Sequence, residues 1–232
     1  MNTKSPITSW YQPAVLGRND INRLLSLSIA FSCLMVLARI VYTGRLTFIF
    51  LIWNLFLAWL PYLVTNTMRR RAARMSVGSG FICWFVVWLL LIPNSFYIIT
   101  DLFHLNNQSI VGAVPQWFDL ALILSFTWNG LLLGVLSVRQ MEKMVKAVWP
   151  SCSELIFVYP IMWLNALGVY VGRWLRFNSW DVVTNPFSLV RDIGAILVHP
   201  IQYRFAWAMI MCYSVFMTLI YLTLKKLSRA IH

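Results

Sequence analysis

The sequence predicts an all-α bundle of about six transmembrane helices with one short amphipathic helix in the membrane interface. Three observations support this prediction. Of the 232 residues, 60% are hydrophobic and only 11% are charged, whereas a soluble domain is about 45–50% apolar and about 25% charged. Six stretches are apolar over the roughly 20 residues that a helix needs to cross a bilayer. Basic residues are abundant in alternate connecting loops, which is typical of multi-pass membrane proteins.

The six expected spans follow the chain in order, and polar or basic residues separate them. They cover residues 24–43, 46–65, 80–99, 119–138, 154–174 and 205–224. Together they make up a membrane domain of residues 24–224, with residues 1–23 and 225–232 as cytoplasmic tails. Only Gly44 and Arg45 separate the first two spans, which predicts a tight helical hairpin.

The Lys and Arg residues of the short loops predict the orientation of the bundle. Thirteen lie on one side: Lys4, Arg18, Arg23, Arg69, Arg70, Arg71, Arg74, Arg139, Lys143, Lys146, Lys225, Lys226 and Arg229. Five lie on the other side: Arg45, Arg173, Arg176, Arg191 and Arg204. Arg39 lies inside the first span. Because the cytoplasmic side carries the excess of basic residues, both termini are expected in the cytoplasm. The net charge of +12 is then a consequence of topology, and a nucleic-acid partner is not expected.

A short amphipathic helix is expected between the fifth and sixth spans, in the outer interface of the membrane. Asn185 and Pro186 are a favourable N-cap and first-turn pair, and the pair His199-Pro200 ends the segment. The apolar residues between them recur at helical spacing: Leu189, Ile193, Ile196 and Leu197. Such a helix lies in the plane of the interface and covers one end of the bundle.

Small residues predict close packing between helices rather than chemistry. The fourth expected span contains Gly130 and Gly134, and the fifth contains Gly168 and Gly172. Each pair forms a G-x-x-x-G motif, which permits two membrane helices to approach closely. The four cysteines form no closely spaced pair, which argues against a disulfide framework or a zinc site.

The third span ends in the polar sequence PNSFYIITDLFHL, which predicts a site. Asn94, Tyr97, Asp101 and His104 are spaced i, i+3, i+7 and i+10, so a continuous helix would align them on one face. Thr100 precedes the aspartate. Pro93 is expected to loosen the helix just before this stripe, since proline removes a backbone hydrogen bond. The stripe therefore predicts a wet cavity lined by protein.

Two further segments are expected to meet this stripe on the extracytoplasmic side. Asp119 begins the fourth span, and the fifth span ends in GRWLRFNSWD. The polar and aromatic residues of that second segment are Arg173, Arg176, Asn178, Trp180 and Asp181. Arg173, Arg176 and Trp180 would share a face if the segment were helical. Ionisable groups at this depth are costly and often mark a functional site.

The residues leave several interpretations of this polar pocket open. The carboxylates and guanidinium groups could neutralise one another as a structural ion-pair network. Asp101 and His104 could be part of a metal site, although an isolated D-x-x-H pair is a weak signal. Arg173 and Arg176 could hold a phosphate or carboxylate group of a substrate. Asp101 and His104 could then act as general acid and base, or bind a metal, and Asp119 could orient these two side chains. A solute in transit is the remaining alternative.

Four segments together resemble an uncharacterised family of bacterial membrane proteins, the domain of unknown function numbered 1361. They are IWNLFLAWLP around Asn54, PNSFYIITDLFHL, DLALILSFTWNGLLLG and GRWLRFNSWD. The family pattern P-N-x-x-Y-x-x-T-D-x-x-H is kept at every named position of the third span. Family members often have Pro in place of Phe96 and Trp in place of Phe177. The resemblance implies an integral membrane protein and supplies no reaction.

The sequence therefore predicts a multi-pass protein of the bacterial plasma membrane with a polar pocket facing out of the cytoplasm. The pocket is expected to bind a small ligand, a lipid headgroup or a partner membrane protein. The helices around it are expected to contact the lipid bilayer. The first alternative is a membrane enzyme acting on a lipid-linked or phosphorylated envelope substrate, and the second is a small transporter. Neither a cofactor nor a metal follows from the residues.

Overall fold

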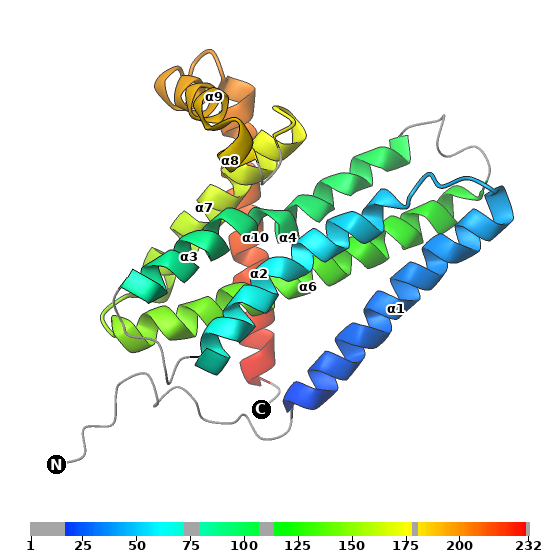
Figure 1. Ribbon diagram of the computed structural model, residues 1–232, viewed down its shortest axis with the longest axis horizontal. Coiled ribbons are helices and arrows are strands. Elements are labelled where there is room, and N and C mark those ends of the chain that lie inside the picture. Colours follow the sequence, from blue (N-terminus) through cyan, green and yellow to red (C-terminus); the bar gives the residue numbers. More distant parts are fainter. Residues whose placement is uncertain (1–16, 72–78, 107–113, 178–180, 231–232) are drawn as a thin grey trace.

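A computed structural model of the chain shows an all-α membrane protein (Figure 1). The structure describes residues 17–71, 79–106, 114–177 and 181–230. Within them, six helical segments are long and apolar enough to cross a membrane, as the sequence predicted. The described residues contain no strand.

The described residues form ten helical elements, which follow one another along the chain. They are α1 (Gly17–Thr43), α2 (Phe50–Arg71), α3 (Ser79–Leu91), α4 (Pro93–Tyr97), η2 (Ile98–Asn106), α6 (Gln116–Val148), α7 (Glu154–Arg173), α8 (Asp181–Thr184), α9 (Pro186–Val198) and α10 (Arg204–Ala230). The segments that could span the membrane alternate in direction. We call the end of the bundle that contains η2 and the start of α6 the η2 end. The opposite end, where α6 finishes, is the Glu142 end.

Helix α6 is the centre of the bundle and runs through it between the other spans (Figure 1). It packs against α1, α2, α4 and η2. Its 33 residues exceed the expected span of residues 119–138, so Arg139, Lys143 and Lys146 lie in a helix rather than in a loop. The extra turns are helical because no glycine or proline interrupts the chain between Gly134 and Pro150.

The first two helices do not form the expected tight hairpin. Gly44 adopts a φ of 64°, a left-handed conformation that glycine tolerates and that ends α1. Turns then extend to residue 49, so α2 covers Phe50–Arg71 rather than residues 46–65. Helix α1 packs mainly against α6, and Figure 1 shows it at the edge of the bundle. Its contact with α2 includes a hydrogen bond of 3.3 Å from the Tyr62 hydroxyl to Asn22 Oδ1.

The third span breaks at Pro93, as the sequence predicted. Helix α3 ends at Leu91, a single turn forms α4, and residues 98–106 continue as the 3-10 helix η2. The prediction of one continuous α-helical stripe is wrong, because a 3-10 helix has about three residues per turn instead of 3.6. Asp101 and His104 remain aligned within η2, whereas Asn94 and Tyr97 belong to the separate turn α4.

The expected amphipathic helix is present as α9 and lies beyond the end of α7 (Figure 1). Ile196 is buried, and Leu189 and Ile193 pack against the α7 side chains Leu167 and Val171. Two details differ from expectation, since Leu197 is 42% exposed and the side chain of Asn185 makes no capping hydrogen bond.

Candidate functional site

The turn α4 lies between α6 and α7, and the two G-x-x-x-G motifs face it from opposite sides. A Cβ atom added to Gly134 would lie 3.0 Å from side-chain atoms of Ser95 and Phe96. One added to Gly168 would lie 2.7 Å from Pro93. Gly130 likewise leaves no room for a Cβ against Ile98, and Gly172 packs on the ring of Tyr97. These glycines therefore set how closely the broken segment approaches its neighbours, which confirms their predicted packing role.

Three helices contribute polar side chains to a cluster at the η2 end. Asp101 of η2 is 1% exposed and accepts a hydrogen bond of 2.9 Å from Nδ2 of Asn54, on α2. His104, also on η2, lies 3.3 Å from Arg173 of α7, measured from Nε2 to Nη1. The His104 ring packs on Phe50 with centroids 4.9 Å apart. Asp101 precedes His104 by three residues on η2, which places both on the same side of that 3-10 helix. The structure therefore brings together Asp101, His104 and Arg173.

Asp119 lies outside this cluster, because Arg39 of α1 binds its carboxylate. Arg39 Nε lies 2.7 Å from Asp119 Oδ1, and Nη2 lies 3.1 Å from Oδ2. The two side chains are 2% and 0% exposed, and the guanidinium also stacks on the Phe48 ring at 4.4 Å. This bidentate geometry is the strong form of an arginine–carboxylate pair. The expectation that Asp119 orients Asp101 and His104 is therefore not supported by its contacts.

The other expected site residues of the α7 segment have different surroundings. Helix α7 ends at Arg173, and Arg176 is exposed with a φ of 59°, so the two arginines do not share a helix face. Asp181 is the first residue of α8 and accepts a hydrogen bond of 3.0 Å from Thr184. The predicted residues Asn178 and Trp180 lie outside the described residues.

Thr100 is buried, and its hydroxyl donates to the backbone oxygen of Tyr97 at 2.7 Å. This bond to the preceding turn satisfies the hydroxyl within its own segment. Thr100 therefore helps to hold the passage from α4 to η2, and its side chain forms no hydrogen bond with Asp101, His104 or Arg173.

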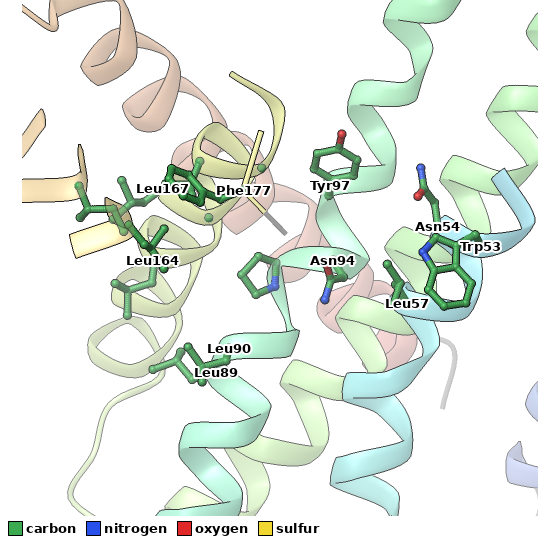
Figure 2. Close-up of a pocket in the computed structure, with 16 residues that line it drawn as sticks. Trp53, Asn54, Leu57, Leu89, Leu90, Asn94, Tyr97, Leu164, Leu167 and Phe177 are labelled. Atoms are coloured by element: carbon green, nitrogen blue, oxygen red, sulfur yellow. The ribbon is translucent and has the colours of Figure 1, made fainter. Parts of the chain in front are cut away.

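Asn94 and Tyr97 line a cleft of about 360 Å³ between α2 and α7 (Figure 2). Asn54 lines the same cleft while it donates to Asp101, so the cleft and the polar cluster share one residue. The remaining lining is mainly aliphatic and aromatic, and α2, α3, α7 and α9 contribute to it. Sequence reasoning treated these apolar positions as ordinary membrane-span residues.

A metal site has little support from the geometry. The part of the chain that the structure describes contains no group of three or more His, Cys, Asp or Glu that could hold a metal ion. Asp101 and His104 alone would supply two ligands, fewer than the four that zinc sites usually have.

A second buried charge cluster lies at the Glu142 end, and sequence reasoning missed it. Lys225 of α10 is 4% exposed and lies 2.6 Å from Glu142 of α6 and 2.9 Å from Glu154 of α7. Tyr221 donates a short hydrogen bond to Glu142, and Lys146 lies 2.8 Å from the same carboxylate. Each buried charge therefore has an opposite charge beside it, which is the arrangement of a structural ion-pair network.

The pairing of Asp119 with Arg39 was not predicted, although Arg39 had a recognisable signal that Asn54 shares. Arg39 and Asn54 are isolated polar side chains inside otherwise apolar spans. A charge or amide at that depth requires a partner from another helix, since lipid supplies none.

Comparison with known proteins places the chain in a family. A family profile described as "Protein of unknown function (DUF1361)" matches residues 53–221, from the second span to the sixth. No curated protein and no solved structure matches the chain. The matched range includes α4, η2 and the polar cluster around Arg173, and excludes Arg39. Because the match covers well over half of the sequence, the chain belongs to the DUF1361 family of proteins of unknown function.

Proposed function

We propose that the chain is a non-enzymatic binding component of the bacterial plasma membrane, with a site for an anionic group at Arg173 and His104. The observation that carries this proposal is a contrast between Arg173 and the two cations that are buried in the described membrane-spanning helices, Arg39 and Lys225. Arg39 and Lys225 each lie within 3 Å of a carboxylate oxygen. Half-buried Arg173 forms no ion pair with any described carboxylate, and its polar neighbour is the imidazole of His104.

A guanidinium in such a position favours an anionic ligand. Its planar N–H groups bind carboxylate or phosphate oxygens in a bidentate manner. The ring of Phe103 lies 5.7 Å from the Arg173 guanidinium carbon and restricts its position from one side. Asp101 accepts a hydrogen bond from Asn54 and forms no ion pair with Arg173, so the guanidinium is not neutralised by direct contact with this carboxylate.

The proposed location of the protein and its orientation in the membrane rest on the distribution of basic residues and on the family resemblance. The basic residues at the Glu142 end outnumber those at the η2 end, which favours a cytoplasmic Glu142 end. The polar cluster would then face the extracytoplasmic side, and both termini would be cytoplasmic. The bacterial setting rests on the family resemblance. The enzymatic alternative is weakened because Arg39 already engages Asp119.

Thermal unfolding of the detergent-solubilised protein in inorganic phosphate tests the anion site. A ligand at 100 times its Kd adds about 2.7 kcal/mol of stability. For a chain of this size that is a rise of about 5–10 °C in the unfolding midpoint. We expect phosphate to raise the midpoint of the unsubstituted protein above its value in chloride of equal ionic strength, and Arg173→Gln to abolish that rise.

The matched control is Arg204→Gln, an exposed arginine at the same end of the bundle. It should retain the full phosphate effect. The proposal is contradicted if phosphate stabilises all three proteins equally. It is also contradicted if Arg173→Gln lowers the midpoint by the same amount in both salts, since that result assigns Arg173 a structural role.

A further inference from the structure

The cleft beside the polar cluster lies among membrane-spanning helices and is lined mainly by hydrocarbon. Its volume of about 360 Å³ lies within the range of about 300–1,000 Å³ that is usual for small-molecule sites. Leu57 of α2 forms one wall, Leu164 and Leu167 of α7 form the opposite wall, and Leu89 and Leu90 lie at one end (Figure 2). These side chains offer no hydrogen bond to an ion or a polar solute.

The polar side chains of the cleft lie toward its other end. Figure 2 shows Asn54, Tyr97 and Phe177 at the end opposite Leu89 and Leu90, with Asn94 between. The chain continues from Tyr97 directly into η2, which carries Asp101 and His104. The apolar part of the cleft therefore leads toward the polar cluster.

Two contacts link this polar end to Arg173. Gly172, the residue before Arg173, lines the cleft and packs on the ring of Tyr97. Asn54 lines the cleft and donates to Asp101 of η2, and the same helix carries His104, whose Nε2 lies 3.3 Å from Arg173 Nη1. Arg173 itself is not part of the lining, but it directly follows the lining residue Gly172, so the polar end of a molecule in the cleft would lie toward the cation.

We propose that the cleft holds one hydrocarbon chain of an anionic amphiphile whose headgroup binds at Arg173 and His104. This inference rests on the anion site of the proposed function and specifies its ligand class. Burial of methylene groups against leucine and aromatic side chains stabilises the bound chain, and the guanidinium binds the anionic head. A fatty acid and an anionic phospholipid share this chemistry.

The architecture of the cleft favours this occupant over a polar solute. A solute in transit requires polar groups along its path, whereas here the polar side chains are confined to one part of the lining. An apolar cavity also holds water poorly. The cleft lies among the helices that could span the membrane, so lipid chains are the apolar molecules that surround it.

Native mass spectrometry of the full chain in detergent micelles tests the inference. Three probes are titrated into delipidated protein: palmitate, phosphatidylglycerol and the neutral lipid monoolein. We expect one tightly bound anionic amphiphile per chain and weaker binding of monoolein. Tighter binding of palmitate would indicate a single-chain ligand, and tighter binding of phosphatidylglycerol would indicate a phospholipid.

Two variants fill the cleft from opposite walls, Leu57→Trp and Leu164→Trp. Each displaces several methylene groups of the ligand, so the Kd for the anionic probes should rise by at least about tenfold. The matched control is Leu124→Trp on α6, where Leu124 is 51% exposed and does not line the cleft. The control should bind like the unsubstituted protein. Arg173→Gln should weaken palmitate and phosphatidylglycerol by about tenfold or more and leave monoolein unchanged.

The outcomes separate the two proposals. If Arg173→Gln weakens binding while both cleft variants bind normally, the anion site stands and the hydrocarbon occupant of the cleft is refuted. If both cleft variants weaken binding while Arg173→Gln has no effect, a chain site remains but the anionic headgroup and the proposed function are refuted. If no probe binds the unsubstituted protein, the amphiphile is refuted, and the phosphate experiment decides the anion site separately.

Discussion

The buried pair of Arg39 and Asp119 joins α1 to α6 and provides the sharpest stability test of the fold. Substituting Arg39→Met removes the guanidinium and leaves Asp119 without its cation in a site where the carboxylate is 0% exposed. Substituting Asp119→Leu removes the carboxylate that two nitrogens of the guanidinium contact. The double variant replaces both side chains with apolar groups, so neither charge of the pair remains buried without the other.

The expected magnitude follows from the geometry. Two contacts of 2.7 and 3.1 Å are lost in either single variant, and water does not reach the remaining group. Breaking a buried pair by removing one partner costs about 3–5 kcal/mol. For a chain of this size that lowers the unfolding midpoint by about 6–20 °C. The double variant should lie within about 1–2 kcal/mol of the unsubstituted protein, since apolar replacement of a buried pair is often nearly neutral.

The unfolding midpoints of the four proteins in detergent measure the interaction between Arg39 and Asp119. Size-exclusion chromatography after heating gives the fraction that remains folded. The matched control is Arg191→Met with Asp192→Leu on α9, a pair 3.3 Å apart whose side chains are 78% and 33% exposed. Such a pair contributes about 0–1 kcal/mol, so its variants should change the midpoint little. The reasoning is refuted if Arg39→Met is as mild as Arg191→Met, or if the double variant loses the sum of the two single losses.

Two further predictions concern packing and orientation. Gly168→Ala should cost about 1–3 kcal/mol in thermal unfolding because the added methyl group would lie 2.7 Å from Pro93. Gly194→Ala, with nothing within 4 Å, should be neutral or slightly stabilising, and equal effects would contradict the close packing. In a cysteine-free background, Ile201→Cys at the η2 end should react with a membrane-impermeant maleimide in intact cells. Lys226→Cys should react only after permeabilisation, and the reverse pattern would invert the proposed topology.

The number and order of the membrane helices were predictable from local sequence. Each span must satisfy its own backbone hydrogen bonds and present apolar side chains to lipid, so each carries its signal in about 20 consecutive residues. The ends were less predictable. The second helix covers residues 50–71 instead of 46–65, and the fourth continues to Val148, because helix propensity and turns rather than hydropathy decide where helices stop.

The candidate site was predictable only in part. The motif of the third span contains two residues of the polar cluster, Asp101 and His104, and Pro93 predicted the break in the helix. The 3-10 conformation of residues 98–106 was not apparent from spacing, which assumes an α-helical period. Arg176 was expected beside Arg173, but the end of α7 places it in a left-handed conformation and exposes it.

The composition and order of residues were sufficient to establish a multi-pass helical membrane protein, its broken third span and the packing role of its glycine pairs. Only the tertiary structure decided which charges meet: Asp119 binds Arg39, Lys225 binds Glu142, and Arg173 lies beside His104. The physical reason is that a hydrophobic span determines that a helix forms, whereas its rotation and depth against its neighbours come from packing far along the chain. Those two variables determine the partner of every buried polar side chain and the position of the cleft beside Tyr97.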